Sequence, residues 1–304
     1  MTARRVSKLI RQIRRHCRNC RFAHRRGGCV VEIRQARALA VHECRGYFAH
    51  RVSVRGLLEA MAEHTTYGAA FADVYDEWYG AADDLVLVTA LLGEHSPRRV
   101  LELGVGTGRV ALAMAEIVVA AGGQVVGVDE SPEMLSVLAS KDPRGLVTLV
   151  RGDMANDQPS GEFDLIFISY NTLFNLSGTT QQATCITNAA SRLAPSGRLI
   201  IDACIIHPDA PTHGTTSEQR GDWHVHTTSS FDAATGIVQG TTVSTHNDGH
   251  RVQRPWRIAY QSPAAIDALC ARAGLSLLAR HASWHKAPFT DDAQRHVSVF
   301  GNLR

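Results

Sequence analysis

The sequence predicts an α/β fold, a doubly wound, mostly parallel sheet of seven strands with an antiparallel sheet inserted late in the chain. Between residues 99 and 204, apolar runs of strand length alternate with helical patterns, which predicts parallel strands covered by helices on both faces. Residues 222–260 instead alternate in threonine, valine and histidine between turn signals, as antiparallel strands do. A chain of 304 residues that is 44% hydrophobic can bury one or two domain cores.

The elements of the main sheet follow in order along the chain. Its first strands are expected at 99–103, 124–128, 147–150, 163–169 and 197–204, with helices near 108–121, 131–140 and 179–193. Ser131, Pro132 and Glu133 start the second helix, because a capping side chain, a proline in the first turn and an early carboxylate all favour a helix N-terminus. Three antiparallel strands are expected within 222–260. A helix at about 263–273 and strands near 275–284 and 295–302 complete the main sheet.

A glycine-rich turn joins the first predicted strand to its helix. Gly104, Gly106 and Gly108 alternate with other residues, so the backbone can adopt positive φ and approach a ligand closely. The helix that follows aims free N–H groups at that ligand, and Glu102 fits a cationic ligand end. Dinucleotide-binding folds use a similar turn, but their third glycine comes one residue later, where this chain has Arg109.

A carboxylate, Asp129, ends the second predicted strand, at the place of a ribose-binding residue in a doubly wound sheet. This feature fits both a dinucleotide and S-adenosylmethionine (SAM). Four motifs in order separate the two cofactors, because residues 67–304 resemble the class I SAM-dependent methyltransferase family. The family's motifs are matched by Glu102–Gly108, Val128–Leu135, Arg151–Met154 and Phe163–Ile168.

The resemblance implies a Rossmann-like domain that binds SAM and releases S-adenosylhomocysteine. In the family pattern, Glu102 and the backbone of Gly104 and Gly106 hold the methionine end, Asp129 holds the ribose, and Asp153 with Met154 frames the adenine. The cofactor contacts implied in this way are Tyr75, Glu102, Gly104, Gly106, Asp129, Glu130, Met134, Asp153, Met154 and Ser169.

Several of these residues also have a purely structural interpretation. Met134 and Met154 suit ordinary core packing, since methionine is a flexible filler. Residues 71–76 resemble the family's N-terminal helix, which closes over the cofactor with Tyr75 facing it. The four-residue spacing of Phe71, Tyr75 and Tyr79 equally suits a buried helix face.

The acceptor side is predicted from the residues that follow the fourth strand. The run from Ser169 to Asn175 lacks the Pro-Pro-aromatic signature of nucleic-acid amino methyltransferases. Tyr79, Tyr170 and Asn171 are the predicted acceptor contacts. The candidate catalytic residues are Tyr170, His224 and His226. The two histidines share one face of a predicted strand and could take a proton near neutral pH, although a solvated strand face explains them as well.

Charge divides the chain unevenly. Residues 1–60 carry 15 Lys and Arg against 3 Asp and Glu, and residues 61–304 carry 17 against 26. We expect 1–60 to be a disordered extension or one foreign to the native protein, 61–204 to bind SAM, 205–261 to form a lid over the active site, and 262–304 to close the sheet. The acidic body argues against a surface for nucleic acids or anionic membranes.

Together these features predict a methyltransferase for a small organic acceptor, with nitrogen favoured slightly over carbon or oxygen, as in natural-product biosynthesis. The alternatives are a nucleic-acid methyltransferase recruited by the basic N-terminus and a catalytically silent SAM-binding protein. We expect a monomer or homodimer. A reducing cytoplasm is the expected compartment, since the cysteines are too widely spaced for a disulfide framework. No metal and no membrane segment are expected.

Overall fold

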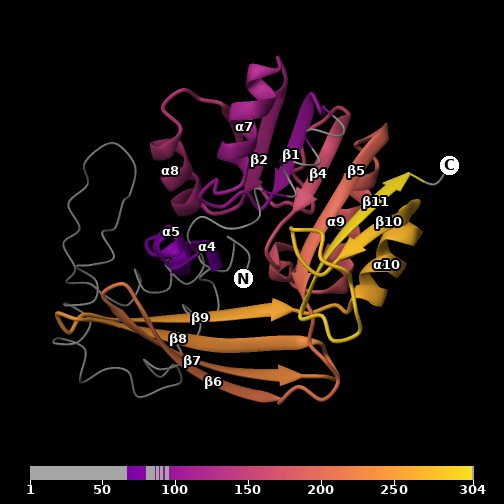
Figure 1. Ribbon diagram of the computed structural model, residues 1–304. Coiled ribbons are helices and arrows are strands. Elements are labelled where there is room, and N and C mark those ends of the chain that lie inside the picture. The colour runs from indigo at the N-terminus through magenta and orange to yellow at the C-terminus, as the bar shows by residue number, and fades with distance from the viewer. Residues whose placement is uncertain (1–66, 80–85, 87–88, 90–91, 93–95, 303–304) are drawn as a thin grey trace, which may run out of the picture. The chain divides into compact units, whose positions relative to one another are not determined.

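The computed structural model describes residues 67–79, 86, 89, 92 and 96–302 (Figure 1). The predicted basic extension, residues 1–60, lies outside these described residues. Seven strands of the described chain form one sheet in the order β10-β11-β5-β4-β1-β2-β3. They are β1 (Arg99–Leu103), β2 (Gln124–Asp129), β3 (Val147–Arg151), β4 (Phe163–Ile168), β5 (Leu193–Cys204), β10 (Leu275–His281) and β11 (Arg295–Asn302).

The direction of the strands confirms the predicted doubly wound, mostly parallel sheet. β1 pairs in parallel with β2 and β4, β2 with β3, and β4 with β5. β11 and β10 add an antiparallel hairpin beside β5. The strand order reverses between β1 and β4, and in open α/β sheets ligands bind beyond the carboxyl ends of the strands at this point.

Four helices cover the two faces of the sheet (Figure 1). They are α7 (Ala111–Ala120), α8 (Pro132–Lys141), α9 (Thr179–Ala190) and α10 (Pro263–Arg272). Side chains of α9 and α10 share one buried cluster, and those of α7 and α8 share the other. The predicted start of α8 is confirmed, because Ser131 Oγ accepts a hydrogen bond from the Met134 amide at 3.2 Å. No described helix has the length and apolar character that crossing a bilayer requires.

Strand β5 is longer than predicted and shortens the helix before it. It begins at Leu193, opposite Phe163, and the pairing register shifts before it continues at Arg198. The expected helix to residue 193 therefore ends at Ala190.

The inserted sheet has four strands where three were predicted. β6 (His213–Arg220), β7 (Trp223–Asp232), β8 (Ile237–His246) and β9 (Arg251–Ala259) form an antiparallel meander in sequence order (Figure 1). The strand that the sequence did not reveal is β6, whose residues are polar or glycine and almost all exposed. It has no apolar alternation, so only its pairing with β7 defines it.

The single N-terminal helix expected over 71–76 is also wrong in detail. Two short helices, α4 (Tyr67–Phe71) and α5 (Tyr75–Tyr79), flank a turn. In a continuous helix the Ala70 carbonyl would accept from the amide of Val74, but it accepts from Arg254 Nη1 of β9 at 2.6 Å. The Val74 amide instead donates to the Phe71 carbonyl at 3.0 Å. The side chain of Arg254, 184 positions along the chain from Ala70, therefore replaces a helical hydrogen bond at the point where the helix breaks.

Candidate active site

The loop after β1 has the backbone conformation that its glycines predict. Gly104, Gly106 and Gly108 have φ of 74°, 54° and 79°. A Cβ at Gly104 would overlap the side chain of Thr172, whereas a Cβ at Gly106 would meet nothing within 4 Å. The backbone at Gly106 therefore borders open space, where a ligand can approach it closely.

Asp129, at the carboxyl end of β2, joins this loop to the start of α8. Its Oδ2 accepts from the Gly106 amide at 2.8 Å, and its Oδ1 accepts from the Ser131 amide at 2.9 Å. Burial raises the pKa of this carboxyl, and the amide donors act in the opposite direction. Each carboxylate oxygen keeps a further lone pair, so the group can also accept from ribose hydroxyls.

Glu102 lies at the carboxyl end of β1 and is only 2% exposed. Its Oε1 accepts from Ser169 Oγ at 3.3 Å, while its buried Oε2 has no hydrogen-bond partner among the described residues. Burial raises the pKa of Glu102 well above its usual value, and the Arg109 charge, the Ser169 hydroxyl and the Ala111 amide act in the opposite direction. A buried carboxylate oxygen without a donor is costly, and an ammonium group supplies that donor.

Glu102 and Asp129 therefore fit the two polar ends of SAM that the sequence assigned to them. Glu102 would hold the amino-acid end and Asp129 the ribose, with the open backbone of Gly106 between them.

Short helix α5 is tied to the glycine loop through one carboxylate. Asp76 Oδ1 accepts from Thr107 Oγ1 at 2.6 Å, and Asp76 Oδ2 pairs with Lys141 Nζ of α8 at 2.6 Å. These bonds hold α5 beside the loop, as expected of a segment that closes over the cofactor.

Aromatic rings from α5 and from the turn after β4 meet beside the loop. The ring centroids of Tyr75 and Tyr79 are 4.9 Å apart, and those of Tyr79 and Tyr170 are 5.9 Å apart. The Arg109 guanidinium carbon lies 4.9 Å from the centroid of Tyr170. Burial raises the pKa of Tyr75, with Arg109 opposing, so this phenol keeps its proton at neutral pH. We call Tyr75, Tyr79 and Tyr170 the tyrosine wall.

The remaining predicted cofactor residues have other contacts in the structure. Met134 and Met154 are 3% and 8% exposed and belong to buried apolar clusters. The Asp153 carboxylate accepts from the Ala155 amide at 2.8 Å and from the Asn156 carboxamide at 2.7 Å within its own loop. Glu130 is exposed. Their contacts with the cofactor stay predictions.

His224 and His226, the candidate bases, do not lie beside the tyrosine wall. They are exposed, and Val225 between them is buried against α4 and α5. Because successive strand residues point to opposite faces, both histidines lie on the side of the sheet away from those helices. His226 Nδ1 is 2.8 Å from Ser217 Oγ of the neighbouring strand. We therefore interpret both histidines as part of a solvated strand face.

Asn171, a predicted acceptor contact, uses its side chain to hold its own turn. Its Oδ1 accepts from the Cys204 amide at 2.6 Å. Sequence reasoning missed Asp202, which is 1% exposed and binds this turn from the end of β5. The sequence does contain a signal for Asp202, because this one acidic residue interrupts the apolar run from Leu199 to Cys204. Sequence reasoning also missed Arg220 of β6, whose guanidinium carbon lies 5.2 Å from the centroid of Tyr79.

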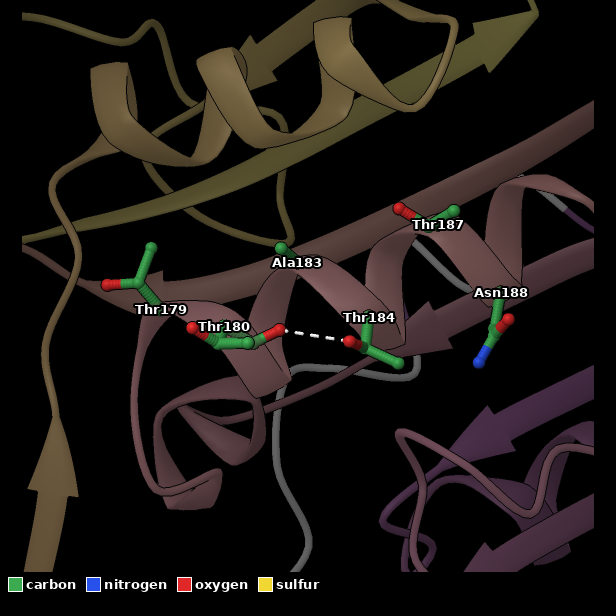
Figure 2. Close-up of a pocket in the computed structure, with 6 residues that line it drawn as sticks. All are labelled: Thr179, Thr180, Ala183, Thr184, Thr187 and Asn188. Carbon is green, nitrogen blue, oxygen red and sulfur yellow. Dashed lines mark hydrogen bonds between the residues drawn. The ribbon is translucent and has the colours of Figure 1, made fainter.

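A shallow hollow follows the outer side of α9 and shares no residue with the tyrosine wall. Figure 2 shows its lining of short side chains, in which Thr184 Oγ1 donates to the Thr180 carbonyl at 3.0 Å. The other lining residues are Thr179, Ala183, Thr187 and Asn188. No group of three potential metal ligands occurs in the described part of the chain.

Comparisons with known proteins point to methyltransferases. A family model described as "Methyltransferase domain" matches residues 100–197. The structure of the CcbJ methyltransferase from Streptomyces caelestis is 31% identical and superposes with a TM-score of 0.72, covering 79% of this chain and 99% of that one.

Two curated relatives match over shorter stretches. The cypemycin N-terminal methyltransferase of a Streptomyces species is 34% identical over 140 residues, which is 42% of this chain and 56% of the relative. The demethylmenaquinone methyltransferase of Thermus thermophilus is 35% identical over 127 residues, 41% of this chain and 52% of the relative. The chain thus spans about half the length of the curated relatives it matches.

The sheet, its topological switch point and the glycine loop with its two carboxylates define a nucleotide-type cofactor site of the Rossmann-like class. Because the chain is 31% identical to CcbJ over 99% of that protein's length, it belongs to the class I SAM-dependent methyltransferases. SAM is accordingly its cofactor.

Proposed function

We propose that the protein methylates an amine nitrogen of a small molecule or peptide, with SAM as the methyl donor. The observation that carries the proposal is the geometry of the tyrosine wall, whose neighbouring rings can pack against an acceptor, whereas the candidate bases His224 and His226 lie on the other side of the four-stranded sheet. A neutral amine is already nucleophilic, so it needs orientation and exclusion of water more than proton removal. The curated relative from Streptomyces is named for methylation at an N-terminus, which agrees with this class of acceptor.

In this mechanism the residues bind and orient. A bound SAM would supply an electrophilic methyl group: the nitrogen lone pair would form the new bond to carbon, and the sulfur would keep the electron pair of the broken bond. Glu102 and Asp129 would hold the two polar ends of the donor, and the tyrosine wall would pack against the acceptor. The methylated ammonium then releases its extra proton to solvent, so no residue of the site has to accept it.

The four-stranded sheet completes the proposal as a lid over the acceptor. Its inner side packs on α4 and α5 through Val225 and Trp256, and Arg220 Nη1 donates to the Trp78 carbonyl of α5 at 3.2 Å. These contacts place the sheet against the segment that carries Tyr75 and Tyr79. The hydroxyls of Thr227 and Thr242, 3.0 Å apart, lie on the same side of the sheet as Val225, because residues two apart in a strand share a face.

The test is a transfer assay with SAM labelled on its methyl group. The full chain is incubated with a panel of primary and secondary amines, peptides with free N-termini, phenols, carbon acids and RNA. We expect label in amines or peptide N-termini, and none in the same acceptors after N-acetylation. Label confined to phenols, carbon acids or RNA would refute the proposal, as would binding of S-adenosylhomocysteine without transfer to any acceptor. The Asp129→Ala variant is the matched control for dependence on the donor site.

A further inference from the structure

Two consecutive residues after β4 adopt a backbone conformation that L-amino acids avoid. Tyr170 has φ of 54° and Asn171 has φ of 65°, and neither is glycine. Such conformations persist only where the surrounding structure enforces them, and they gather at functional sites. This turn lies at the topological switch point of the sheet, beside the glycine loop.

Asp202 of β5 provides most of that enforcement. Its Oδ2 accepts from the Tyr170 amide at 2.9 Å, and its main-chain carbonyl accepts from the Asn171 amide at 3.1 Å. The side chain of Asn171 makes a further bond to β5, because Asn171 Oδ1 accepts from the Cys204 amide at 2.6 Å. Both strained residues are therefore bonded to the same short stretch of β5.

The carboxylate of Asp202 is itself fixed from the far side. Arg295 of β11 donates to it from Nε and from Nη2, each at 2.5 Å, and Trp284 Nε1 donates to Oδ2 at 3.1 Å. Asp202 and Trp284 are each 1% exposed. A planar guanidinium that pairs with both oxygens sets the orientation of the carboxylate, and so the direction in which Oδ2 meets the Tyr170 amide.

The held turn presents the ring of Tyr170 to the site. This ring is 38% exposed, although the Arg109 and Arg295 guanidinium carbons lie 4.9 Å and 5.3 Å from its centroid. Its edge contact with Tyr79 completes the tyrosine wall. Among the described residues, the ring of Tyr170 therefore stays open on one side, where a bound molecule can pack against it.

We propose that Asp202 is a positioning residue, which holds Tyr170 in the left-handed turn so that its ring forms the acceptor side of the site. This inference rests on the proposed function, since the acceptor is the molecule that the ring contacts. A small misplacement of such a group costs up to about 100-fold in kcat/KM for the acceptor. The predicted donor contacts Glu102 and Asp129 lie on β1 and β2, and Ser169, which precedes the turn, donates to Glu102.

The sharpest test compares two variants at one position. Asn171→Ala and Asn171→Gly both remove the bond to the Cys204 amide, but only glycine adopts positive φ without cost. We expect the acceptor KM of Asn171→Ala to exceed that of Asn171→Gly by about tenfold, with equal affinity for S-adenosylhomocysteine. Equal acceptor KM values in the two variants would overturn the proposal.

Asp202 is tested directly with Asp202→Asn, which keeps the size of the side chain and removes its charge. We expect a rise in acceptor KM of about tenfold, unchanged affinity for S-adenosylhomocysteine, and partial recovery of KM in Asp202→Asn/Asn171→Gly. Trp284→Phe is the matched control, because it removes another donor to the carboxylate and leaves the Tyr170 bond. A loss of thermal stability in both variants with neither KM changed would mean that Asp202 is merely structural.

A double variant and a hydrogen-exchange measurement distinguish these outcomes. If Asp202→Asn does not fold, Asp202→Asn/Arg295→Met removes the cation that pairs with Asp202 as well, and the same rise in KM is required of it. Hydrogen exchange of the peptide containing Tyr170 is measured without any acceptor, and should be at least tenfold faster in Asp202→Asn than in the wild type. Wild-type protein that methylates no amine refutes the proposed function, and unchanged exchange refutes the role of Asp202.

Discussion

Replacement of Glu102 by glutamine separates binding from stability at the donor site. The variant keeps the shape of the side chain and removes the charge that faces the ammonium group of the cofactor. A hydrogen bond to a charged group contributes about 1.5–3 kcal/mol, which corresponds to a roughly 10- to 150-fold weaker Kd. Titration calorimetry with S-adenosylhomocysteine measures this without an acceptor, since that product has the same amino-acid end.

The stability of the ligand-free protein should change in the opposite direction. Glu102 Oε2 is buried without a hydrogen-bond partner in the described structure, and a neutral amide costs less to bury than a carboxylate. We therefore expect a higher Tm for Glu102→Gln together with its weaker binding. An unchanged Kd would refute the contact with the ammonium group, and a fall in both quantities would indicate damage to packing.

The pH dependence follows from the raised pKa of Glu102. The ligand-free folded protein takes up this proton at a higher pH than the unfolded chain does, so the contribution of Glu102 to folding stability grows as pH falls through the raised pKa. The cationic ligand requires the ionised form, so its affinity should fall over the same range. In Glu102→Gln the effects of Glu102 on stability and on affinity should both lose their pH dependence. The pH dependence of stability that remains should be the weaker one caused by the raised pKa of Asp129.

Three further predictions concern single residues of the site. Gly104→Ala should lower Tm more than Gly106→Ala in thermal melts, because both lose about 1–2 kcal/mol to positive φ but only the first overlaps Thr172; equal shifts would contradict the packing. Asp129→Ala should weaken binding of S-adenosylhomocysteine by about 1–3 kcal/mol in calorimetry, since the ribose loses a charged acceptor; full affinity would exclude that role. His226→Ala should leave kcat within twofold of the wild type, because this side chain is exposed on the outer face of the lid sheet; a large loss of kcat with normal cofactor affinity would restore His226 as a base.

The sequence predicts the backbone geometry of the glycine loop well because that geometry is set by neighbouring residues. Gly104, Gly106 and Asp129 lie at the ends of strands whose apolar runs are easily recognised, and their roles follow from the turn that they make. Glu102 was predicted from position alone. The structure adds that one of its oxygens is buried without a partner in the described chain, which only three-dimensional packing can create.

The acceptor half depends on contacts between distant segments, which no local pattern reports. Tyr170 and Asn171 were selected for their place after a strand, but their strained turn needs Asp202 and Arg295, 32 and 125 positions beyond Tyr170. The choice between a base and a solvated strand face for the two histidines also could not be made from the sequence. Period-two spacing shows that His224 and His226 share a face but not which face, and the burial of Val225 decides it.

The bond from Arg254 to the Ala70 carbonyl has a consequence for biosynthesis of the chain. α4 and α5 leave the ribosome early, whereas Arg220 and Arg254, which bind them, are made some 140 to 180 residues later. Contacts that close such long loops form late in folding. We expect the central strands to assemble first and α4 to dock only after β9 is made, while the bonds of Asp76 to Thr107 and Lys141 can already hold α5 beside the glycine loop.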